Sequence, residues 1–124
     1  MTRKATVNIL LAEDDRNLAT VIKHELEDED HSIDLVHDGV EAVLHVIDKP
    51  YHCILIDIVM PNLDGINALR IIKRLSPEVP VIVFSGNAGA DKTEASSRMG
   101  AMKCLAKPFS MSELKGDIEK YTEK

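Results

Sequence analysis

The sequence predicts a doubly wound α/β domain, in which a five-stranded parallel sheet carries helices on both faces. Two observations lead to this fold class. Apolar runs of strand length alternate five times with amphipathic segments of helix length. The apolar runs also have no regular polar side, and parallel sheets bury such strands under their crossover helices on both faces. Ligands bind to sheets of this kind beyond the carboxyl ends of the strands.

The five predicted strands are short apolar runs bounded by polar or turn-forming residues. They cover residues 6–12, 32–36, 53–59, 79–85 and 101–106. The third of them contains Asp57, at a position where another valine would pack better. A buried carboxylate is costly unless something pairs with it, so Asp57 indicates a function at the end of this strand.

A helix is predicted after each strand. Leu18, Val21, Ile22 and Leu26 recur at helical spacing after the first strand, and further helices are predicted over residues 38–49, 64–75, 88–99 and 110–121. Asp38 and Glu41 form a capping-box-like pair, Asp64 is the expected N-cap of the third helix, and Ser110 is followed three residues later by Glu113. The fourth segment has little apolar content, so its helical pattern is the weakest.

Length and composition indicate one domain over residues 1–124, with no output domain attached. The chain has 124 residues, 44% of them hydrophobic, and no Pro-, Gly- or Ser-rich linker. Its formal net charge of −6 argues against nucleic-acid binding, which needs clustered Lys and Arg. No apolar run approaches the roughly 18 to 20 residues of a membrane span. Cys53 and Cys104 fit small buried residues of a reducing compartment, although the sequence leaves a disulfide open. We therefore expect a cytoplasmic protein.

Polar side chains follow the apolar part of four strands. They are Glu13 and Asp14 after the first, Asp57 at the third, Ser85 at the fourth and Lys107 after the fifth. In the predicted fold all of them lie at one edge of the sheet. Two carboxylates about 4 Å apart repel by roughly 4 kcal/mol at an effective dielectric near 20. A bound divalent cation would remove this repulsion, so the cluster indicates a metal site. Oxygen ligands favour Mg²⁺, and Asp57 could then attack a phosphoryl group whose charge Ser85 and Lys107 stabilise.

Four motifs, in their order and spacing, resemble the receiver domain of two-component response regulators. They are ILLAEDD, LIDIVMPNLDG, VIVFSGN and CLAKPF, and the resemblance covers roughly residues 6 to 122. It implies a flavodoxin-like sheet with the strand order 2-1-3-4-5. It also implies a phosphoacceptor switch rather than an enzyme acting on other molecules. A histidine kinase or a histidine phosphotransfer protein would supply the phosphoryl group, and a downstream target protein would read it.

The resemblance also implies a role for each site residue. These roles are phosphoryl acceptor for Asp57, direct Mg²⁺ ligand for Asp14, ligand through water for Glu13, ligand through its backbone carbonyl for Val59, and phosphoryl contacts for Ser85 and Lys107. The Lys107–Pro108 bond is expected to be cis. Val59 and Asn87 are expected to flank the water that hydrolyses the phosphorylated aspartate. Cys104 departs from the family, which usually has Tyr or Phe at this position.

Other functions fit parts of the pattern. A haloacid-dehalogenase-type hydrolase also phosphorylates an aspartate, but it needs a second carboxylate two residues on, where this chain has Val59. The main alternative is a receiver-like protein-binding module that works without phosphorylation. Each site residue alone has a simpler explanation. The acids after the first strand, Asp15 above all, favour the start of a helix. Ser85 alone could be a turn residue, and Lys107 alone could be a solvated surface charge. The five histidines, His37 among them, show no i, i+4 ligand pair and are expected at the surface or on helix faces.

Overall fold

The computed structural model describes residues 6–86 and 89–122, and it confirms the predicted fold class. Five parallel strands form one sheet in the order β2-β1-β3-β4-β5. Along the chain the elements are β1 (Asn8–Ala12), α1 (Arg16–Glu27), β2 (Ser32–Val36), α2 (Gly39–Asp48), β3 (Cys53–Asp57), α3 (Gly65–Leu75), β4 (Val81–Ser85), α4 (Gly89–Arg98), β5 (Lys103–Ala106) and α5 (Met111–Thr122). Strands β1, β4 and β5 begin two residues later than predicted, and β3 ends two residues earlier, at Asp57.

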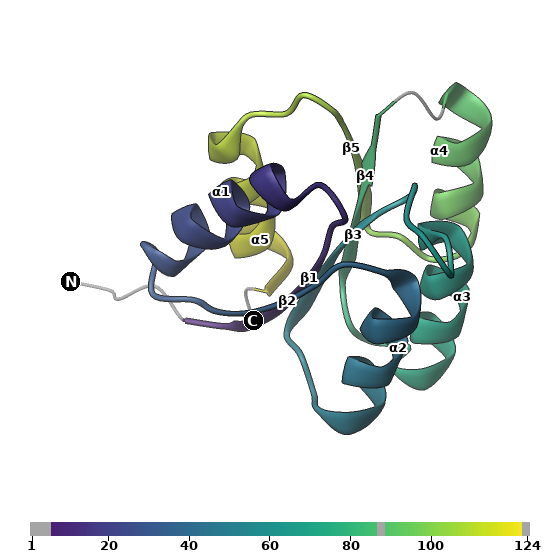
Figure 1. Ribbon diagram of the computed structural model, residues 1–124, viewed down its shortest axis with the longest axis horizontal. Coiled ribbons are helices and arrows are strands. Elements are labelled where there is room, and N and C mark those ends of the chain that lie inside the picture. The colour runs from purple at the N-terminus through teal and green to yellow at the C-terminus, as the bar shows by residue number, and fades with distance from the viewer. Residues whose placement is uncertain (1–5, 87–88, 123–124) are drawn as a thin grey trace.

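The sheet lies between two layers of helices (Figure 1). Helices α1 and α5 cover one face, and α2, α3 and α4 cover the other. Each face has its own core: Ile9 and Leu11 of β1 pack on the side of α1 and α5, whereas Leu10 packs on the side of α2 and α3. Because successive side chains of a strand point to opposite faces, a strand covered on both sides must be apolar throughout. This explains the continuous apolar runs of the sequence.

The predicted capping residues lie at the starts of the helices. The side chains of Asp15, Asp38, Asp64 and Ser110 each accept a hydrogen bond from a backbone N–H in the first turn that follows. Such bonds satisfy donors that have no partner within the helix. Asp15 is therefore the N-cap of α1, as its position after the other two acids suggests.

Among the described residues, the helices are too short or too polar to span a membrane.

Helix α1 buries a narrower face than the sequence predicts. Ala19, Ile22 and Leu26 are fully buried, whereas the side chain of Val21 is 53% exposed. Val21 recurs at helical spacing with the other apolar residues of α1, but it does not share their buried face. It precedes Ile22 by one residue, which turns it about 100° around the helix and away from the sheet.

The register of the strands brings their carboxyl ends to one edge. Ala12 pairs with Ile56, so the residues after β1 lie beside Asp57. Asp57 pairs with Phe84, and Ser85 pairs with Ala106. Ser85 and Lys107, which come one residue after these pairs, therefore lie at the same edge of the sheet as Asp57. The predicted site residues are therefore neighbours in space.

Gly65 allows helix α3 to begin against the end of β3. A Cβ atom at this position would lie 2.1 Å from the carbonyl oxygen of Asp57 and 2.6 Å from the Cα of Ile58. The N–H of Gly65 also donates to the carbonyl oxygen of Ile58 at 2.7 Å. Any larger residue would push the helix away from the loop after Asp57, so Gly65 helps to shape the site.

Candidate functional site

Three carboxylates gather at the carboxyl edge of the sheet. Glu13 and Asp14 come from the loop after β1, and Asp57 ends β3. One oxygen of each lies within 4.8 Å of the others. Glu13 is fully buried and Asp57 is 4% exposed, whereas Asp14 reaches solvent. The cluster thus has two buried members and one member open to an approaching ion or ligand.

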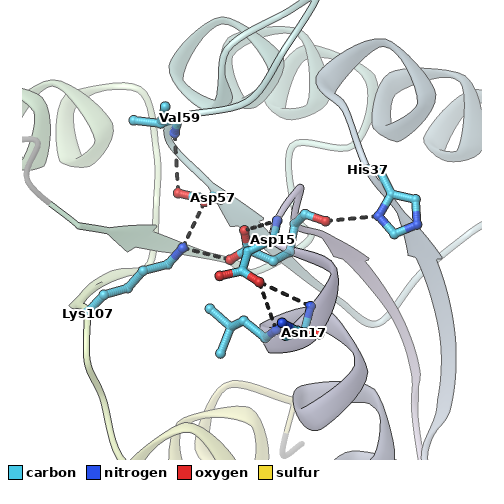
Figure 2. A network of polar contacts seen from close by, with 8 residues as sticks. Asp15, Asn17, His37, Asp57, Val59 and Lys107 are labelled. Atoms are coloured by element: carbon cyan, nitrogen blue, oxygen red, sulfur yellow. Dashed lines mark hydrogen bonds and ion pairs between the residues drawn. The ribbon is translucent and has the colours of Figure 1, made fainter.

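Lys107 joins the two buried carboxylates (Figure 2). Its Nζ lies 2.8 Å from Oε1 of Glu13 and 2.8 Å from Oδ2 of Asp57. Burial acts to lower the pKa of Lys107, but its hydrogen bonds to Asp57 and Glu13 outweigh this and raise the pKa above its usual value. The lysine therefore stays charged and offsets the cost of burying Asp57.

Glu13 has a strongly perturbed pKa. Burial, followed by the neighbouring Asp57, raises it from 4.5 to about 7, although Lys107 acts in the opposite direction. The backbone N–H of Asp15 also donates to Oε2 of Glu13 at 3.1 Å. One ammonium group does not neutralise two buried carboxylates, so the site has room for further positive charge.

Ser85 and Val59 lie at the same edge of the sheet as the Asp57 carboxylate. Ser85 is 5% exposed, and its carbonyl oxygen accepts a hydrogen bond from the backbone N–H of Lys107 at 2.8 Å. The N–H of Val59 donates to Oδ1 of Asp57 at 3.3 Å, and the Val59 side chain is 63% exposed. The Lys107–Pro108 peptide bond is cis, as expected. Asn87 lies outside the described residues.

His37 is a neighbour of the site that the sequence analysis missed. Its Nδ1 lies 3.1 Å from the carbonyl oxygen of Glu13 (Figure 2). Its Nε2 lies 3.3 Å from Nη1 of Arg16. A carbonyl oxygen can only accept, so Nδ1 donates and Nε2 accepts from Arg16. His37 directly follows β2, and that position at the carboxyl edge is the signal that could have identified it.

The residues present fit a hard divalent cation. Their donor set consists of carboxylate oxygens, from Glu13, Asp14 and Asp57, close enough together to share one ion. Oxygen ligands without sulfur or imidazole suit Mg²⁺ rather than zinc or copper. Neither cysteine belongs to this cluster, since Cys53 is buried at the start of β3 and Cys104 is half-buried in β5. This edge of the sheet therefore carries an acidic cluster with one lysine, and the oxygen atoms of the cluster suit a hard divalent cation.

Comparisons with known proteins agree with this character. Residues 9–119 match the response regulator receiver domain family. The response regulator MprA of Mycobacterium bovis is 30% identical over 109 residues, which are 88% of this chain and 47% of that protein. The chain spans about half the length of the curated relatives it matches.

Two solved structures are also similar. The receiver domain of the sensor histidine kinase PA1611 from Pseudomonas aeruginosa, solved with magnesium coordinated in its active-site cleft, is 34% identical with a TM-score of 0.89, over 97% of this chain and all of that one. The receiver domain of the Francisella response regulator 1452 is 30% identical with a TM-score of 0.89, over 95% and 98% of the two chains. With its fold, its acidic pocket and its family match, the chain belongs to the receiver domains of two-component response regulators, which are signalling switches.

Proposed function

We propose that Asp57 accepts a phosphoryl group, in the presence of Mg²⁺, from the phosphohistidine of a histidine kinase or a histidine phosphotransfer protein. The observation that carries the proposal is the buried Asp57 carboxylate at the end of β3, held beside Glu13 and Lys107. An acid in this position has no role in packing the core. Its cost is offset by neighbours that also suit a transferred phosphoryl group.

In the proposed reaction, an oxygen of Asp57 attacks phosphorus and the P–N bond to the donor imidazole breaks. The electron pair of that bond leaves with the imidazole, and the new P–O bond forms an acyl phosphate. Lys107 would turn from Asp57 to an oxygen of the phosphoryl group, and the Ser85 hydroxyl would donate to another. Both side chains would neutralise charge that is spread over the phosphoryl oxygens in the transition state.

Mg²⁺ would be held by Asp14 and Asp57 directly, by Glu13 through water, and by the backbone carbonyl of Val59. When bound, the ion supplies positive charge at the phosphoryl oxygens and screens the carboxylates from one another. The excess of carboxylates over ammonium groups around Glu13 supports this assignment.

Phosphorylation would change which downstream target protein the chain binds, and the chain would catalyse only its own phosphorylation and dephosphorylation. We propose that it does so in the cytoplasm. The two free thiols support this location, because cysteines of oxidising compartments are usually paired.

The test is incubation with acetyl phosphate, followed by intact mass measurement. The chain should gain the mass of one phosphoryl group with Mg²⁺ and none with EDTA. Asp57→Asn should remain unmodified. The control is Asp15→Asn, which removes a nearby negative charge but keeps an acceptor for the α1 cap, and it should be modified like the parent.

Full modification of Asp57→Asn would contradict the proposal. Failure of the parent to bind Mg²⁺ or to accept phosphate would favour the alternative, a receiver-like module that binds proteins without phosphorylation.

A further inference from the structure

Large apolar side chains are exposed together on α2 and α3. They are Val40, Leu44 and Ile47 of α2 and Ile71 and Leu75 of α3, with exposed fractions between 39% and 59%. Single exposed apolar residues need no explanation, but a group of five on two adjacent helices does. None of them belongs to the phosphorylation site. We call these residues, together with those that line the groove beside them, the α2–α3 surface.

The exposed apolar residues of α2 share one side of the helix. Val40, Leu44 and Ile47 are spaced by four and three residues, so they form one stripe along the helix. Ala42 and Val46, which α2 buries against the sheet, lie on another side of the helix. Helix α3, which packs directly beside α2, carries the exposed Ile71 and Leu75 (Figure 1).

A shallow groove runs along this side of α3. It is lined by Leu63, Asn67, Arg70, Ile71 and Arg74. Within the described residues, no carboxylate forms an ion pair with Arg70 or Arg74, and the guanidinium of Arg70 donates one long hydrogen bond, to the side-chain oxygen of Asn67 at 3.4 Å. The groove thus combines apolar walls with two cations one helical turn apart that are open to a partner.

We propose that the α2–α3 surface binds an acidic amphipathic helix of a partner protein. Such a helix would lay leucine-like side chains between α2 and α3 and point carboxylates at Arg70 and Arg74. Charge selects this occupant: the chain carries a net charge of −6, so most of its surface repels an acidic segment, while this groove attracts one. The surface needs no phosphoryl group at Asp57, and the proposal does not rest on the proposed function.

A second copy of the chain fits this surface less well. A two-fold contact uses the same patch on both copies, so Arg70 and Arg74 of one copy would approach the same arginines of the other. Like charges that meet at an interface disfavour it. An acidic partner removes this conflict.

The test uses two synthetic helical peptides and the unphosphorylated chain. Both peptides carry leucines at positions i, i+4 and i+7, flanked in one by glutamates and in the other by lysines. Binding is measured by fluorescence anisotropy, and the bound surface is mapped by NMR chemical-shift changes. We expect the glutamate peptide to bind at least tenfold more tightly than the lysine peptide, with shift changes concentrated in α2 and α3.

Two charge reversals separate the groove from the overall charge. Arg74→Glu should weaken binding of the glutamate peptide at least fivefold and reverse the preference toward the lysine peptide. Lys120→Glu on α5 is the matched control, since it changes the net charge equally, and it should leave the preference unchanged. Leu44→Ser should weaken both peptides.

Equal binding of the two peptides, shift changes centred on another surface, or no saturable binding would overturn the proposal. Self-association of the parent that Arg74→Glu and Leu44→Ser both abolish would also overturn it, in favour of a second copy as the occupant. Because no assay here uses phosphorylation, these outcomes are independent of any failure to modify Asp57.

Discussion

Replacing Glu13 by glutamine should flatten the pH dependence of stability of the metal-free chain. In the folded state, burial and then Asp57 raise the pKa of Glu13 from 4.5 to about 7. The folded chain therefore holds this proton more tightly than the unfolded chain does. The associated stability is fully present below about pH 4.5 and is lost as the pH rises through 7.

The size of the effect follows from the same two values. A rise from 4.5 to about 7, at roughly 1.4 kcal/mol per pKa unit, corresponds to about 3 kcal/mol of unfolding free energy. Glutamine is close to Glu13 in shape and can still accept the hydrogen bond from the Asp15 N–H, but it carries no charge. In EDTA the variant should match the parent near pH 5 and exceed it at pH 8 by up to that amount.

The assay is urea unfolding of both proteins at several values between pH 5 and 8. Groups other than Glu13 affect both curves, so the informative quantity is the difference in unfolding free energy between the two proteins at each pH. Saturating Mg²⁺ should reduce the slope of the parent, because a cation stabilises the charged carboxylate. If the difference in unfolding free energy between the two proteins stays constant from pH 5 to 8, folding does not raise the pKa of Glu13 as described.

Further predictions concern the thiols, the lifetime of the phosphoryl group and helix α4. Burial raises the pKa of Cys53 to about 12, so iodoacetamide at pH 8 should alkylate Cys104 much faster than Cys53 in the folded chain, and equal rates by peptide mapping would contradict this. Cys104→Ala should cost about 1 kcal/mol in urea unfolding but leave the ratio of partner affinities with and without phosphate unchanged; a collapse of that ratio would make the thiol part of the switch. Val59→Asn should speed hydrolysis of the acyl phosphate at Asp57, because an amide can orient a water and valine cannot; an unchanged decay of the phosphorylated mass would exclude this role. Amide hydrogen exchange should be faster in α4 (Gly89–Arg98) than in the other helices and should slow on phosphorylation, whereas uniform protection would refute a mobile α4.

The sequence predicts the sheet and the candidate site well because both depend on short-range signals. Strands covered on two faces must be apolar along their whole length, so their runs are easy to locate. In a parallel sheet their carboxyl ends share one edge, so Asp57, Ser85 and Lys107 could be brought together without any knowledge of loops. The caps Asp64 and Ser110 are equally local, since each bonds a backbone N–H three residues on.

What the sequence does not predict depends on how elements pack. The position of His37 after β2 indicates the edge of the sheet on which it lies, but its partner, the Glu13 carbonyl, follows only from the pairing of β2 with β1. Cys104 was expected to be buried like Cys53, but β5 is an edge strand with one neighbour, which leaves the thiol half-buried.

The proposed phosphorylation of Asp57 is tested most directly by locating the modified atom. The chain is phosphorylated with acetyl phosphate and Mg²⁺ and then reduced with borohydride, which converts a phosphorylated aspartate to homoserine. Tandem mass spectrometry of the digest identifies the position. We expect homoserine at position 57 alone, and none when EDTA replaces Mg²⁺. Homoserine at position 14 or elsewhere, or unmodified aspartate at 57 in a chain that has gained phosphate, would contradict it.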